Sequence, residues 1–158
     1  MIEDSKMLWL CKSCARIGRC RLGITEEKLI VPGRIESTLM CGVEYEAGPS
    51  IAHGGWTAAV MDDILGHLAI VEGRRAVTAR LTVEFVKPVP LERQLTATAW
   101  CESNEGGQRL HRAELRLATT GALLARGCGL FVERDDSHFD RHRKWLAEHD
   151  ASAISRKT

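Results

Sequence analysis

The hydrophobic and polar positions of this 158-residue chain change their period once, near the middle of the sequence. Across residues 53–72 the apolar side chains recur every three or four positions, which predicts a mostly apolar helix of about five turns. Across residues 77–85 apolar and polar side chains alternate instead. This alternation predicts a strand with Leu81 and Val83 on one face and Thr78 on the other.

Further segments complete the predicted order of elements. Turn signals at residues 104–107 and 120–121 separate alternating stretches that suit antiparallel strands. A strand, a long helix and then four strands in succession predict an α+β domain, in which a curved five-stranded antiparallel sheet wraps round one central helix. The remaining predicted strands span residues 33–46, 93–103, 108–120 and 122–134, and a terminal helix spans residues 137–150.

The composition of the chain divides it into three parts. Residues 1–32 hold three of the six cysteines and several basic side chains, and we expect a helical and looped extension there. Residues 33–135 contain the predicted sheet and central helix, and we assign them to a single domain. Residues 136–158 form the predicted C-terminal helix and tail.

Charge and composition exclude several classes of partner. The chain has 22 Lys and Arg against 21 Asp and Glu, so no global field attracts nucleic acid or a membrane surface. Aromatic residues make up only 5%, which argues against a surface for stacking bases. The N-terminal apolar run, Met7 to Leu10, is too short for an export signal or a membrane span. We therefore expect a cytoplasmic protein with reduced cysteines.

Two adjacent carboxylates, Asp62 and Asp63, interrupt the apolar helix. On a helical wheel the neighbours of Asp62 are all small: Ala58, Ala59, Gly66 and Ala69. Small side chains allow a ligand or another backbone to approach, so Asp62 is a reachable carboxylate that suits a general base or a nucleophile. The alternative is that both acids mark the place where the helix contacts water or another subunit.

The start of the same helix offers a second chemical feature. Gly54 and Gly55 leave its first turn without side chains, and the first amides of a helix have no acceptor within the helix. These amides suit an oxygen that develops negative charge. We predict that they lie close enough to Asp62 to act on one carbonyl. The alternative for His53-Gly54-Gly55 is a helix cap with tight packing.

The motif "HGGWTAAVMD", with "GP" upstream and "VTARLTVEFVKPVPL" downstream, resembles the hotdog-fold acyl-CoA thioesterases. It is most similar to the His-Gly-Gly branch, which includes the phenylacetate-pathway thioesterases and the mitochondrial thioesterase-superfamily proteins. The resemblance covers residues 34–133. It implies a long helix wrapped by a five-stranded sheet. It also implies two subunits joined into one continuous sheet with active sites at their interface, as a homodimer or a homotetramer.

The resemblance also implies roles for individual residues. Asp62 is the general base or nucleophile, the Gly55 amide polarises the thioester carbonyl, and His53 holds the loop or the carbonyl. Thr78 occupies the position where mitochondrial relatives carry a hydroxyl near the attacking water, contributed across the interface. Many bacterial members have an asparagine six residues before the histidine, where this chain has Ala47. The candidate substrate-binding residues are Gly54, Trp56, Ala58 and Gly66, with Trp56 either in the acyl tunnel or in the core.

Basic side chains and cysteines provide two further sets of candidates. The phosphates of coenzyme A need cations, and we expect no other cofactor. A CxxC spacing raises the alternative of a structural zinc ion, whereas the same cysteines also suit small buried residues. The candidate cations are Lys87, Arg112, Arg116, Arg126 and residues 141–144, and the candidate zinc ligands are Cys11, Cys14, Cys20 and Cys41.

The sequence therefore predicts an acyl-CoA thioesterase that hydrolyses a thioester to a free acid and coenzyme A. Three alternatives stay open. A non-catalytic acyl-CoA-binding protein would share the fold without needing a reachable acid. A hydratase of the same fold uses an aspartate followed by a histidine five residues later, and His67 has that spacing from Asp62. A scaffold protein would make the His-Gly-Gly motif accidental.

Overall fold

A computed structural model describes residues 12–150 of the chain. Its elements follow the predicted order, with one additional strand near the N-terminus and short elements before the long helix. In chain order they are α1 (Lys12–Ile17), β1 (Ile24–Val31), β2 (Arg34–Met40), the 3-10 helix η1 (Val43–Tyr45), β3 (Glu46–Gly48), β4 (Ile51–Ala52), α2 (Gly54–Val71), β5 (Ala76–Phe85), β6 (Gln94–Glu105), β7 (Gln108–Leu117), β8 (Leu123–Glu133) and α3 (Asp136–His149).

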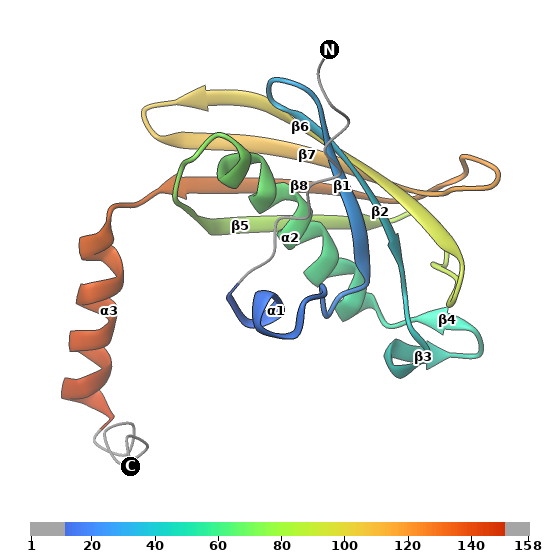
Figure 1. Cartoon of the computed structure of the whole chain (residues 1–158), viewed down its shortest axis with the longest axis horizontal. Helices are drawn as coiled ribbons and strands as arrows, with labels where there is room; N and C mark the ends of the chain where they lie inside the picture. The colour runs from blue at the N-terminus through green and yellow to red at the C-terminus, as the bar shows by residue number, and fades with distance from the viewer. Residues whose placement is uncertain (1–11, 151–158) are drawn as a thin grey trace.

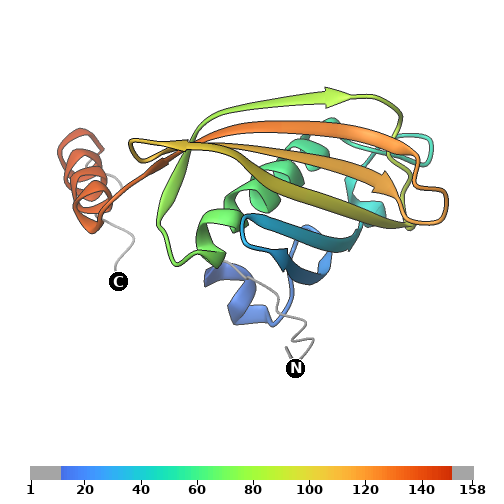
Figure 2. The same ribbon diagram turned by 90° about the horizontal axis from the view of Figure 1, so that it is seen from above.

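The main sheet is antiparallel throughout and curves around α2 (Figures 1 and 2). Its strand order is β1-β2-β6-β7-β8-β5, so β1 and β5 form its two edges. The predicted turn between β6 and β7 is present, with Gly106 and Gly107 at φ angles of 57° and 77°. Two such residues in succession are typical of a tight hairpin turn. The prediction of an α+β fold with a helix wrapped by a curved sheet is confirmed.

The sheet has six strands, whereas the sequence analysis predicted five. Strand β1 lies in the segment that was expected to be helix and loop, and it pairs along the whole of β2. Its sequence, ITEEKLIV, places three charged residues in a row, so it shows no alternation. The predicted first strand also ends early, at Met40, and is followed by η1 and β3.

The apolar stripe of α2 fills the concave face of the sheet. Val60, Ile64 and Leu68 are at most 1% exposed. Burial of each such side chain contributes about 1.5–3 kcal/mol to folding. Strand β8 permits close contact with the helix because it has glycine at Gly127, where a side-chain carbon would lie 3.1 Å from the Met61 sulfur. Helix α2 is therefore fixed on this side, and only its opposite side is available for chemistry.

A buried polar network fastens the end of α2 to the sheet. Arg109 on β7 is 1% exposed and donates from Nη2 to Glu72 Oε2 over 2.6 Å. Its Nε donates to Nε2 of His111 over 3.2 Å, and Nδ1 of His111 lies 2.7 Å from the Leu65 carbonyl oxygen. His111 thus accepts at one nitrogen and donates at the other, as only a neutral imidazole can. Burial lowers the pKa of His111.

Helix α3 stands clear of the sheet at the end of β8 (Figures 1 and 2). The helix predicted for the C-terminal part is therefore present, yet none of its side chains is buried. An ion pair between Arg75 and Asp136 links its first turn to the segment between α2 and β5. Within residues 12–150, no helix is both long and apolar enough to cross a membrane.

The neutral state of His111 predicts a pH dependence of stability. Because its pKa is lowered in the folded protein, the stabilisation is present above the unfolded-state pKa of about 6.5 and is lost as the pH falls through the folded-state pKa. We expect the melting temperature to fall between about pH 7.5 and pH 5.5, and to fall less in His111→Gln. Parallel melting curves for the two proteins over this range would contradict the assignment.

Candidate functional site

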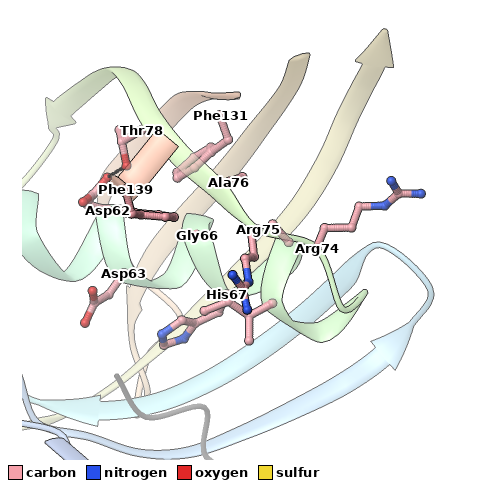
Figure 3. A pocket seen from close by; sticks show the side chains of 12 residues that line it. Asp62, Asp63, Gly66, His67, Arg74, Arg75, Ala76, Thr78, Phe131 and Phe139 are labelled. Atoms are coloured by element: carbon pink, nitrogen blue, oxygen red, sulfur yellow. Dashed lines mark hydrogen bonds between the residues drawn. The ribbon is translucent and has the colours of Figure 1, made fainter. Parts of the chain in front are cut away.

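The candidate site is a cleft of about 310 Å³ on the side of α2 that the sheet leaves uncovered (Figure 3). It lies between α2, the first residues of β5 and the start of α3. One part of its wall carries the two carboxylates, a middle part is apolar, and the far end carries two guanidinium groups. The lining residues are Asp62, Asp63, Gly66, His67, Ala69, Ile70, Arg74, Arg75, Ala76, Thr78, Phe131 and Phe139.

Asp62 and Thr78 meet at this cleft. Asp62 is half-buried, and its Oδ1 accepts a hydrogen bond from the hydroxyl of Thr78 over 2.7 Å. Both residues belong to the same chain. One carboxylate oxygen is therefore held by the threonine, which fixes the direction of the acid.

A β-bulge in β5 brings Thr78 to the helix. Thr78 pairs with Phe131 and Arg80 pairs with Leu130, so Ala79 is an extra residue between two successive pairs. The extra residue shifts the alternation by one position. Thr78 consequently faces α2 together with Leu81, although simple alternation placed the two residues on opposite faces. That part of the strand prediction is wrong, and the bulge is the reason.

Asp63 and His67 face a different direction from Asp62 (Figure 3). Burial raises the pKa of Asp63, and the negative charge of Asp62 raises it further, whereas His67 lowers it. Nδ1 of His67 lies 2.6 Å from Oε1 of Glu27, a fully buried residue of β1 that also accepts from Ser37 over 3.3 Å. His67 is thus engaged by the sheet edge rather than by Asp62. This arrangement weighs against the hydratase alternative.

The start of α2 is capped by His53. The Gly55 amide donates to Nδ1 of His53 over 2.8 Å, and His53, Gly54 and Gly55 are all exposed. The helix cap considered from the sequence is therefore present. Gly54 lies against the ring of Phe85, which a side-chain carbon on the glycine would approach to 3.5 Å.

Gly55 and Asp62 do not converge within one chain. They are seven residues apart on the same helix, which places them about 10 Å apart along its axis. A carbonyl group that accepts from one and is attacked beside the other spans far less than this distance. The prediction that one chain brings both groups to one carbonyl is wrong, because the helical rise separates them.

The other predicted substrate-binding residues lie in different parts of the molecule. Gly66 lines the cleft, and Ala58 is half-buried on α2. Trp56 is 3% exposed, and its Nε1 donates to the Leu22 carbonyl oxygen over 3.2 Å. Of the two possibilities for Trp56, the structure places it in the core. Ala47 lies on β3, where the sequence departs from the bacterial pattern.

The cations at the cleft were not among the sequence-predicted candidates. Arg74 and Arg75 line the far end of the cleft, directly after α2. They belong to the sequence EGRR at residues 72–75. Arg74 pairs with Glu133, and Arg75 pairs with Asp136. Three of the predicted arginines also pair with acidic neighbours, but on the opposite face of the sheet: Arg112 with Glu102, Arg116 with Glu114, and Arg126 with Glu84. Lys87 is exposed in the loop after β5.

One predicted cation of the terminal basic run does lie near the cleft. Arg143 lines an adjoining cavity of about 540 Å³, to which Arg75 and Phe139 also contribute. Phe139 itself lines the main cleft from α3, and sequence reasoning gave no reason to place it there. Placing Phe139 at the cleft requires the direction of α3, and the local sequence pattern does not contain that information.

Three of the four candidate zinc ligands are buried, and they do not gather into a metal site in the part of the chain that the structure describes. Cys14, Cys20 and Cys41 are each at most 8% exposed, and residues 12–150 contain no group of three side chains suited to a metal ion. Burial, together with the charge of Glu44, raises the pKa of Cys41 to about 11, so this thiol is protonated at neutral pH. Cys11 lies outside the described residues.

Comparisons with known proteins agree with this architecture. Residues 50–106 match the family model of the thioesterase superfamily. The mouse acyl-coenzyme A thioesterase THEM4 is 28% identical over 105 residues, which cover 66% of this chain and 45% of that protein. The chain thus spans about half the length of the curated relatives it matches.

Solved structures share the fold. The E. coli PaaI protein, from the phenylacetic acid degradation operon, has a TM-score of 0.68 at 21% identity, over 78% of this chain and 86% of that one. A Streptococcus pneumoniae thioesterase solved with coenzyme A has a TM-score of 0.64 at 18% identity, over 69% and 84% of the two chains. The S. pneumoniae protein has also been solved with an aspartate and, separately, with a threonine changed to alanine.

The fold and the matched segment define the class: this is a hotdog-fold protein. The resemblance stated from the sequence motifs is confirmed: residues 50–106 are similar to the thioesterase superfamily, and the chain is similar to curated acyl-coenzyme A thioesterases at up to 28% identity.

The burial of Asp63 predicts how this residue affects the thermal stability of the protein. Burial raises its pKa, so the neutral carboxyl group carries no penalty at low pH, whereas the charged carboxylate destabilises the folded protein once the pH rises through the folded-state pKa. We expect Asp63→Asn to raise the melting temperature at neutral pH, on the order of a few degrees. The gain should shrink as the pH falls through the folded-state pKa of Asp63 and should be lost below about 4. A lower melting temperature at neutral pH would contradict this expectation.

Proposed function

We propose that this protein is an acyl-CoA thioesterase in which Asp62 activates the attacking water. The observation that carries the proposal is the hydrogen bond from Thr78 to Asp62 in an open cleft. With one oxygen held by Thr78, the second oxygen of the carboxylate is free to take a proton from water. Direct attack by Asp62 on the thioester is the alternative route within the same site.

The spacing of the two residues gives this proposal further support. Asp62 and Thr78 are sixteen residues apart. In the S. pneumoniae thioesterase, the aspartate and the threonine that were changed to alanine are also sixteen residues apart. An aspartate and a threonine therefore occur at the same separation in both chains.

The reaction needs an oxyanion donor that a single chain does not bring to Asp62. The separation of about 10 Å along α2 is resolved if two copies place their α2 helices side by side and antiparallel, so that Gly55 of one copy faces Asp62 of the other. Ala58 and Ala59 lie midway between these residues, and their small side chains permit such an approach. Strand β5 is at the edge of the sheet and is available to pair with a second copy.

The cleft suits coenzyme A on the side of Asp62 that leads away from Gly55. From Asp62 to Val71 the helix extends for about 13 Å, along an apolar wall that ends at Arg74 and Arg75. The two guanidinium groups at the end of this wall are of a type that suits phosphate oxygens, and they would exchange their present partners, Glu133 and Asp136, for a phosphate. We assign the flexible arm of coenzyme A to this groove and its phosphates to Arg74 and Arg75.

The chemical step follows from these placements. The water oxygen bonds to the thioester carbonyl carbon while its proton passes to Asp62. The carbonyl oxygen becomes negative and is stabilised by the Gly55 amide of the partner copy. The carbon–sulfur bond then breaks, and the sulfur leaves as the thiol of coenzyme A with the proton that Asp62 held.

Substitution of the acid tests this mechanism. We expect Asp62→Asn to lower kcat by about a hundredfold or more, because positioned base catalysis contributes about 10²–10⁴. Release of free thiol from short, medium, long and aryl acyl-CoA substrates is the measurement. Asp63→Asn is the matched control, with the same chemical change on the adjacent residue, and should keep most of the activity. Unchanged turnover in Asp62→Asn, or an equal loss in both variants, would refute the assignment.

A mixing experiment tests whether the site is shared between two copies. Gly55→Pro removes the amide hydrogen in the first turn of α2, and the exposed His53 ring must move aside, because a side-chain carbon at this position would lie 2.8 Å from its Nδ1. Each variant alone, Gly55→Pro or Asp62→Asn, should be nearly inactive. A mixture refolded or co-expressed at equal amounts should recover about a quarter of the wild-type activity, because hybrid dimers contain one intact site. No recovery in confirmed hybrid dimers would show that the two residues do not combine across copies.

A further inference from the structure

Phe139 is the residue through which α3 reaches the candidate site. It lies on the first turn of a helix that buries no side chain, yet it lines the cleft together with Asp62 and Thr78 (Figure 3). Its side chain is 41% exposed. Trp145, on the same helix, is 53% exposed and does not line the cleft. The apolar surface of α3 that faces the cleft is thus provided by Phe139.

The position of Phe139 is set by the strands before it. The Arg134 amide donates to the Arg75 carbonyl oxygen over 2.9 Å, which extends the pairing of β8 with β5 to the last residues before α3. The ion pair between Arg75 and Asp136 connects the first turn of the helix to the same segment. Phe139 follows three residues after Asp136, so two connections near Arg75 place its ring over the groove.

The wall of the groove opposite Phe139 is apolar and buried. Ala69 and Phe131 are at most 2% exposed, and they lie across the groove from α3, with Gly66 leaving space between them. A ring facing such a wall leaves room for an extended, uncharged chain. The groove runs from the carboxylate to the two arginines, so a chain of this kind would connect a thioester at Asp62 to phosphates at Arg74 and Arg75.

We propose that Phe139 is a substrate-binding residue that covers the uncharged arm of coenzyme A. This inference rests on the proposed function for the direction in which the substrate lies. The ring packs on the arm between the thioester and the phosphates, and it therefore contributes equally to all acyl-CoA substrates, whatever acyl group they carry. Helix α3 completes the binding groove, although it lies outside the segment that matches the family model.

Binding of free coenzyme A tests the inference without turnover. We expect Phe139→Ala to weaken the affinity, measured by isothermal titration calorimetry, by about tenfold, because an aromatic contact with the arm is lost. Phe139→Leu should keep most of the affinity. Trp145→Ala is the matched control, an aromatic residue removed from the same helix, and should bind like the wild type. Equal affinity of Phe139→Ala and the wild type would overturn the proposal.

Kinetics with an acyl series separate this role from an acyl-binding role. In Phe139→Ala, KM should rise by a similar factor for acetyl, octanoyl, palmitoyl and phenylacetyl thioesters, with kcat little changed. A change that depends on the acyl group would place Phe139 in the acyl pocket and overturn the proposal. If the wild type binds coenzyme A but hydrolyses none of these thioesters, the proposed function fails while the calorimetric result still decides the role of Phe139. A wild type that does not bind coenzyme A would refute both.

Discussion

The packing of α2 into the concave face of the sheet is the constraint on which the rest of this structure depends. Once Val60, Ile64 and Leu68 are buried, the rotation of the helix about its axis is fixed. Every polar residue on α2 must then lie on the remaining side or find a partner within the protein. Asp62 lies on the open side, whereas His67 is buried and pairs with Glu27. Both the cleft and the buried pair follow from this single orientation.

The bulge at Ala79 is the second decisive feature, because it turns a regular strand into part of a site. Without it, Thr78 would face away from the helix while Leu81 and Val83 pack inward. One extra residue lets the same strand present a hydroxyl to Asp62 and apolar side chains to the core. Bulges commonly have this effect beside active sites.

The sequence predicted those features that depend on local periodicity. Helix α2 and strands β6, β7 and β8 were found because their apolar residues follow a helical or an alternating period over ten or more positions. Strand β1 was missed because Glu26, Glu27 and Lys28 interrupt the alternation. The buried Glu27 is accommodated by partners that come from α2 and β2, which are distant in sequence.

The sequence likewise predicted only part of the candidate site. Asp62 was identifiable from the small residues around it, and Gly66 from the same argument. The bulge, the cleft arginines and Phe139 depend on how β5 and α3 leave the ends of other elements, which no local pattern contains. The separation of Gly55 from Asp62, in contrast, could be predicted from the rise of the helix alone.

The cap at the start of α2 affects how strongly the Gly55 amide binds a substrate oxygen at each stage of the proposed reaction. In the free protein the Gly55 amide is already satisfied by the His53 ring, so any substrate oxygen must displace an internal acceptor. A neutral carbonyl gains little by that exchange, since one hydrogen bond replaces another of similar strength. A fully negative oxygen gains more, because charge-assisted hydrogen bonds are roughly twice as strong. If the Gly55 amide is the oxyanion donor proposed above, it would therefore stabilise the tetrahedral intermediate more than the ground-state complex, and its loss would lower kcat more than it raises KM.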